Sequence, residues 1–137
     1  MAIAKWSTPS TRSSNFAGTA FNSLANGSES ATVTYDNSIN RNLYGAVTVK
    51  LGSITPSAGG SVTLRVVISD GIDTSDKIGG DQYIIPLTSG ASAKVYTIPF
   101  VRTYPFSLRF SLVNNAGVSL NASGNEIYVT PYGEEVI

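Results

Sequence analysis

The stretch "PFSLRFSLV", residues 105–113, decides the fold class of this chain. Its apolar residues Phe106, Leu108, Phe110 and Leu112 alternate with Ser107, Arg109 and Ser111. Because successive side chains of a β-strand point to opposite faces, a period of two places all four apolar side chains on one face. The stretch therefore predicts a strand with one face in a hydrophobic core and the other face in water.

The same alternation recurs along most of the chain from Glu29 onward. It covers residues 29–36, 43–51, 61–68, 83–87, 93–101 and 126–130. Turn-rich segments such as "TPSAGG" (55–60) and "NNAG" (114–117) separate the apolar runs, and no amphipathic helix is present beyond one turn near residues 20–25. The pattern predicts an all-β fold: an antiparallel, jelly-roll-like β-sandwich of about eight strands.

Two other β architectures compete with this prediction. A closed barrel fits the same strand spacing. An immunoglobulin-like sandwich lacks support because the chain has no Cys pair and no Trp in its middle. The expected core residues are Val62, Leu64, Val66, Ile68, Phe106, Leu108, Phe110, Leu112, Ile127 and Val129.

The first 28 residues differ from the rest in composition. They contain two basic residues, no acidic residue and no steady apolar period. We interpret residues 1–28 as an extended arm in front of a β-sandwich domain at residues 29–137, with Trp6, Phe16 and Phe21 as anchors that bind a partner surface. On this hypothesis a chain without residues 2–27 still folds but no longer binds its partner. The rival hypothesis is that the stretch supplies a strand to its own sandwich.

Composition excludes several function classes. The 137 residues suit one domain, and the absence of Cys and His removes disulfides, thiolate metal sites and the commonest general base. Nine basic residues balance nine acidic ones, so nothing favours a nucleic-acid or membrane partner. No apolar stretch is long enough to span a bilayer. We therefore expect no catalytic site, no metal and no cofactor, and a protein that is not an enzyme.

Acidic residues offer the strongest chemical alternatives. Asp70, Asp73, Asp76 and Asp81 crowd one loop and could hold calcium, but their spacing departs from that of a calcium-binding EF-hand loop. A solvated turn explains them more simply. Glu126 with another carboxylate could serve glycoside hydrolysis, but no spacing places two carboxylates together.

Seven tyrosines could form a platform on which sugars stack, although packed rings with wet hydroxyls explain them more simply. If exposed coplanar aromatic rings share one sheet, glycan binding is favoured. If aromatic rings are confined to the core and the arm, a structural role is favoured.

Two long segments carry a resemblance to a known class of protein. They are "FNSLANGSESATVTYDNSINRNLYGAVTVKLGSITPSAGGSVTLRVVISDG" (21–71) and "LVNNAGVSLNASGNEIYVTPYGEE" (112–135). Together they resemble small virion structural proteins of tailed bacteriophages. The resemblance implies a capsid decoration (cement) protein that binds the major capsid protein and forms a homo-oligomer on the particle surface after synthesis in the host cytoplasm. A tail or fibre component, or a carbohydrate-binding β-sandwich module, is the alternative. The resemblance implies no site residues.

Overall fold

The computed structural model describes residues 3–67 and 81–136. Within these ranges the chain forms nine strands and no helix. The strands are β1 (Ala4–Trp6), β2 (Val33–Asp36), β3 (Tyr44–Ile54), β4 (Ser61–Val67), β5 (Gln82–Pro86), β6 (Ser92–Arg102), β7 (Ser107–Asn115), β8 (Glu126–Tyr132) and β9 (Glu134–Val136).

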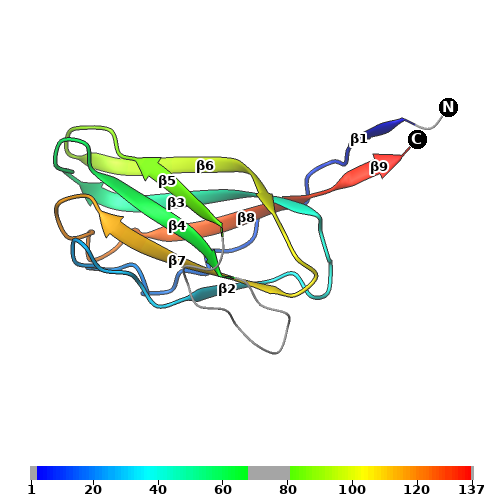
Figure 1. Cartoon of the computed structure of the whole chain (residues 1–137), viewed down its shortest axis with the longest axis horizontal. Coiled ribbons are helices and arrows are strands. Elements are labelled where there is room, and N and C mark those ends of the chain that lie inside the picture. The colour runs from blue at the N-terminus through cyan, green and yellow to red at the C-terminus, as the bar shows by residue number, and fades with distance from the viewer. Residues whose placement is uncertain (1–2, 68–80, 137) are drawn as a thin grey trace.

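Two antiparallel sheets form the body of the molecule (Figure 1). One has four strands in the order β2-β7-β4-β5, and the other has three strands in the order β6-β3-β8. β1 and β9 pair with each other as a separate two-stranded ribbon at one end of the long axis (Figure 1). The predicted all-β antiparallel sandwich is confirmed.

The core forms between the inner faces of the two sheets. In the four-stranded sheet Leu64 lies opposite Leu112 and Val66 opposite Phe110, and all four are buried. In the three-stranded sheet Val47 lies opposite Val129 and Val49 opposite Ile127, again all buried. The period of two in the sequence is thus the period of burial.

Eight of the ten expected core residues are buried: Val62, Leu64, Val66, Leu108, Phe110, Leu112, Ile127 and Val129. The prediction for Phe106 was wrong, because its side chain is 36% exposed. Phe106 precedes the first residue of β7, and the pairing of β7 with β2 ends at Ser107 opposite Asp36, so Phe106 lies beyond the ladder that holds the core. Ile68 lies outside the described residues.

The N-terminal segment, residues 7–30, begins along the edge of the three-stranded sheet, where residues 7–16 follow β8. Backbone N–H groups of Ser7, Ser10, Ser13 and Phe16 donate to the carbonyl oxygens of Gly133, Pro131, Val129 and Ile127, at 2.8–3.3 Å. Residues three apart in the segment thus form hydrogen bonds with residues two apart in β8 and with Gly133, which follows β8. In return Ser7 Oγ, Ser13 Oγ and Asn15 Oδ1 accept from the N–H groups of Gly133, Val129 and Ile127. The segment therefore pairs backbone N–H and C=O groups of β8 that would otherwise be open to another chain.

The same segment contributes to the core. Phe21 is fully buried, and Phe16 packs against Phe110 with ring centroids 5.9 Å apart. Asn114 Nδ2 and the N–H of Leu120 both donate to the carbonyl oxygen of Leu24, which holds the turn after Phe21 against the sandwich. The expectation that Phe21 is an anchor for a partner is therefore corrected, since its ring has no surface left to offer. The segment thus adds side chains to the core but supplies no strand to either sheet of the sandwich, since β1 pairs only with β9.

A carboxylate at the end of this segment fastens it to the four-stranded sheet. Glu29 forms a β-bridge with Val113, and its Oε1 lies 2.6 Å from Nη1 of Arg65. The Ser111 hydroxyl donates to Oε2 of Glu29 at 2.6 Å. Arg65 follows the alternation onto the outer face of β4, but it is mostly covered there by this contact.

Candidate functional site: an aromatic surface

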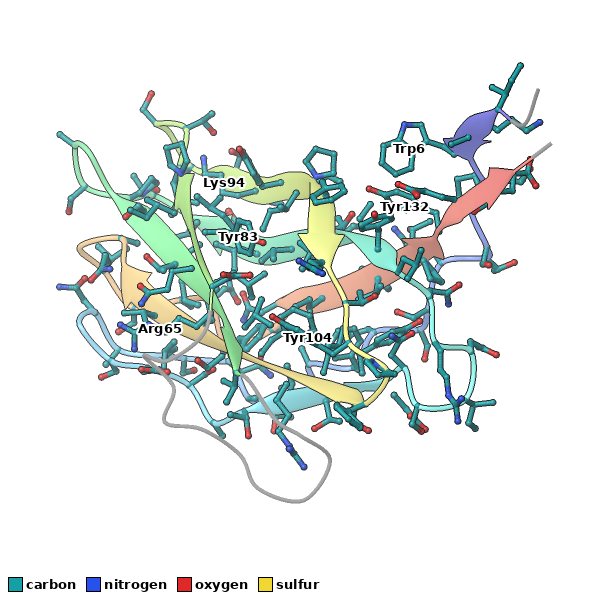
Figure 2. The ribbon with its side chains drawn as sticks, turned by 45° about the vertical axis from the view of Figure 1, so that its right-hand side comes forward. Trp6, Arg65, Tyr83, Lys94, Tyr104 and Tyr132 are labelled. Carbon is teal, nitrogen blue, oxygen red and sulfur yellow. The ribbon has the colours of Figure 1, made fainter. Side chains whose placement is uncertain are left out.

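Four aromatic side chains, two of them labelled in Figure 2, contact one another where the ribbon meets the three-stranded sheet. They are Trp6 of β1, Tyr44 of β3, Phe100 of β6 and Tyr132 of β8, and we call this surface the aromatic end. Tyr44 lies directly opposite Tyr132 in the sheet register. The strand period that buries Ile127 and Val129 inside the sandwich places Tyr132, three residues beyond Val129, on the outer face.

The rings of the aromatic end contact one another in two orientations. Tyr44 lies 4.7 Å from Phe100 and 5.7 Å from Tyr132 between ring centroids, at interplanar angles of 34° and 37°. Trp6 stands edge-on to both tyrosines, at 5.5 and 5.6 Å and 81°. Such tilted and edge-to-face contacts are the arrangements that aromatic pairs prefer. They hold Trp6 in place without covering it.

The aromatic end leaves a large apolar area in water. Trp6 is 58% exposed and Phe100 48% exposed, while Tyr44 and Tyr132 are half-buried. An isolated exposed apolar residue is ordinary, but contiguous large rings are characteristic of interaction surfaces. Of the three predicted anchors, Trp6 is therefore the most exposed, since Phe16 is partly buried and Phe21 is fully buried.

Polar groups fix the two tyrosines. The Tyr44 hydroxyl donates to Oε1 of Glu134 at 3.1 Å, and the Tyr132 hydroxyl donates to the carbonyl oxygen of Pro99 at 2.7 Å. The hydrogen bond to Glu134, and then desolvation, raise the pKa of Tyr44 above its ordinary value. Burial raises the pKa of Tyr132. Both hydroxyls thus stay protonated at neutral pH and act as donors.

The outer face of the same sheet continues with hydroxyl and charged groups. Thr48 and Thr97 lie on neighbouring strands with their hydroxyl oxygens 3.0 Å apart. Farther along, the Arg12 guanidinium lies 3.9 Å from the ring centroid of Tyr128. This cation–π contact covers Tyr128 and ties the N-terminal segment to the sheet face.

The sequence signalled this surface only in part. Tyr44 and Tyr132, two of the seven tyrosines that the sequence offers as a platform, do share one face, but their rings are tilted rather than coplanar. Phe100 was missed. It lies in the stretch "AKVYTIPFV", where the pairing of β3 with β6 shifts register between Gly45 and Val47, so strict alternation does not predict which residues of β6 face water.

The described residues include no cluster of metal-ligating side chains. No group of three or more Asp or Glu side chains lies close enough there to hold a metal ion. Asp70, Asp73 and Asp76 lie outside the described ranges, so the calcium hypothesis stays a prediction. Within the part of the chain that the structure describes, no helix could cross a membrane.

Comparison with known proteins yields distant similarities of fold alone. No protein-family model and no curated protein matches the chain. Among solved structures, one described as TmCBM61 in complex with β-1,4-galactotriose matches at 9% identity and TM-score 0.36, over 81% of this chain and 66% of that chain. A Yersinia pseudotuberculosis-derived mitogen matches at 11% identity and TM-score 0.36, over 100% and 94%. The enzymatically active domain of bacteriophage CBA120 tailspike protein 4 matches at 7% identity and TM-score 0.37, over 100% of this chain and 19% of that chain. At such values these matches carry no argument about function.

Proposed function

We propose that this chain is a bacteriophage virion structural protein, a capsid decoration protein that attaches to the major capsid protein through its aromatic end. The sequence resemblance to small virion proteins motivates the proposal. The observation that carries it is the exposure of Trp6 and Phe100 beside a ribbon that extends from the sandwich (Figure 1). Attachment is non-catalytic and needs only a rigid body with a surface that a partner can cover.

The exposed rings are large enough to matter for attachment. An aromatic side chain offers about 150–250 Å² in all, so the exposed parts of Trp6 and Phe100 leave roughly 200 Å². At about 25 cal/mol per Å², covering that area contributes about 5 kcal/mol before the costs of association. That is the scale of an interface hot spot. Because Trp6 already rests against Tyr44 and Tyr132, little further ordering of its side chain is needed.

A co-sedimentation experiment tests the proposal. Particles from the source of this chain, prepared without it, are mixed with the wild-type chain or with the double variant Trp6→Ala/Phe100→Ala, and are then pelleted. We expect the double variant to bind at least tenfold more weakly. Ile84→Ala is the matched control, since Ile84 is 71% exposed on β5 of the other sheet and should not affect binding. Wild-type affinity in the double variant, or a wild-type chain that never sediments with particles, would contradict the proposal.

A second candidate function is carbohydrate binding on the outer face of the three-stranded sheet. It is favoured by the exposed rings of Trp6 and Phe100 and by the Thr48 and Thr97 hydroxyls farther along the same sheet. Apolar rings with a few convergent polar groups are typical of small-molecule sites. Unlike capsid attachment, carbohydrate binding would not require a second virion protein.

Tryptophan fluorescence separates the two candidates, because Trp6 is the single Trp of the chain and lies in the surface itself. If the chain is a glycan-binding module, some glycan on an array binds it, shifts the Trp6 emission saturably, and loses this effect in Phe100→Ala. If no glycan does so while particles bind, attachment to the particle is supported.

A further inference from the structure

A cavity of about 500 Å³ lies at the side of the sandwich where the chain passes from β5 in one sheet to β6 in the other. Its volume falls in the range of small-molecule sites. The lining is mainly aliphatic and includes Val49, Leu51, Val62, Ile85 and Leu87. The opposite side of the sandwich is covered by residues 7–30, whereas this side is hollowed.

One lysine of β6 also lines this cavity. Lys94 lies opposite Leu51 in the register of β3 and β6, and Leu51 belongs to the core, so the Lys94 side chain is on the inner face. Lys94 is only 6% exposed and is the one charged residue among the buried residues of the described chain. Figure 2 labels it between the sheets, on the β6 side.

The partners of Lys94 do not neutralise its charge. Its Nζ donates to the carbonyl oxygen of Gly90 at 2.9 Å and to the Ser92 hydroxyl at 2.8 Å. Both acceptors are neutral, and within the described ranges no carboxylate forms an ion pair with Lys94. Buried ammonium groups are normally paired, since an uncompensated charge in an apolar interior is costly. An ammonium group has three N–H donors, so one remains for a further acceptor.

We propose that this cavity binds an aliphatic monocarboxylate. The carboxylate accepts the remaining hydrogen bond of Lys94 and supplies the missing negative charge, while the hydrocarbon chain lies against Leu51, Ile85 and Leu87. The site is remote in the sheet from the aromatic end and does not depend on the function proposed above. A lysine that only fastened the turn between β5 and β6 would not distinguish a charged ligand from a neutral one.

Calorimetric titration with decanoate and decanol tests this distinction on the full-length chain. We expect wild type to bind decanoate roughly ten- to a hundredfold more tightly than decanol, the difference that one hydrogen bond to a charged group makes. Lys94→Met should lower the affinity for decanoate to that for decanol. Lys50→Met is the matched control, because Lys50 lies on the outer face beside Tyr128 and its loss should change neither affinity.

A second variant tests the same cavity in case Lys94→Met does not fold. Leu87→Trp retains Lys94 and fills the cavity from a partly buried position, so both ligands should be lost. Vesicles of phosphatidylglycerol form a further arm, in which we expect no sedimentation of the chain with lipid. The proposal is overturned if decanoate does not bind, if it binds no better than decanol, if it still binds Leu87→Trp, or if the chain binds vesicles but not decanoate.

Discussion

Replacing Phe21 by Ala should destabilise the whole sandwich, although Phe21 lies in a segment whose sequence has no strand pattern. Its ring is fully buried in the core. At about 150–250 Å² for an aromatic side chain and 25 cal/mol per Å², its burial corresponds to about 4–6 kcal/mol as an upper estimate. Measured Phe→Ala substitutions in cores cost about 3–5 kcal/mol, and we expect a value in that range.

Urea denaturation followed by circular dichroism measures this cost. A domain of this size has a stability of about 5–15 kcal/mol, so the variant should still fold but with a clearly lower urea midpoint. Trp6→Ala is the control, since a mostly exposed ring should change the free energy of unfolding by less than about 1 kcal/mol. If Phe21→Ala changes the midpoint no more than Trp6→Ala does, the N-terminal segment is not part of the cooperative core.

The burial of Phe21 also changes the expected outcome of deleting residues 2–27. The arm hypothesis expected a folded domain without them. The structure places Phe21 and the partners of the β8 edge in that stretch, so we now expect the deletion to abolish cooperative folding.

Three further predictions concern charge and metal. Glu29→Ala removes the ion pair with Arg65 and the Ser111 hydrogen bond, and should lower the free energy of unfolding in urea by about 1–3 kcal/mol. The hydrogen bond to Glu134 raises the pKa of Tyr44 above its ordinary value of 10.0, and burial raises the pKa of Tyr35. The two tyrosines therefore contribute fully to stability below pH 10, and this contribution is lost as the pH rises through their folded-state pKa. Melting temperatures measured across alkaline pH check this, and a flat profile would refute it. A chelator should leave the melting temperature unchanged, whereas a drop of several degrees would make the Asp70, Asp73 and Asp76 loop a calcium site.

The body of the fold could be predicted because strand alternation is a local signal. Leu108, Phe110 and Leu112 are buried as expected, because the ladder that pairs β7 with β4 and β2 extends over them. Phe106 continues the same alternation but lies outside the paired part of β7, which ends at Ser107. The sequence does not mark the residue at which strand pairing ends. Lys94 was likewise not predictable, since polar character ordinarily indicates an outer face.

The N-terminal segment was misjudged for a physical reason. Its hydrogen bonds advance by three residues for every two on β8, so it has neither a strand nor a helix period. The serines and the asparagine that accept hydrogen bonds from β8 look in the sequence like the residues of a solvated linker. The composition break at Glu29 is real, but it marks a change in hydrogen-bonding pattern and not the start of the core.

Pairing the two ends of the chain has a consequence for the order in which the domain is made. The N–H of Val129 donates to Oγ of Ser13, 116 residues earlier, and β1 pairs with β9. At about 5–20 residues per second, the ribosome needs on the order of 10 s to complete β8 after the N-terminal segment has been synthesised. During that time β8 is absent, so the segment that carries Phe16 and Phe21 has no strand edge to bind. The two rings are then available to chaperones or to other nascent chains. The N-terminal segment is thus translated before β8 but ordered only after it, so slowing translation should prolong the exposure of Phe16 and Phe21 rather than help the sandwich to fold.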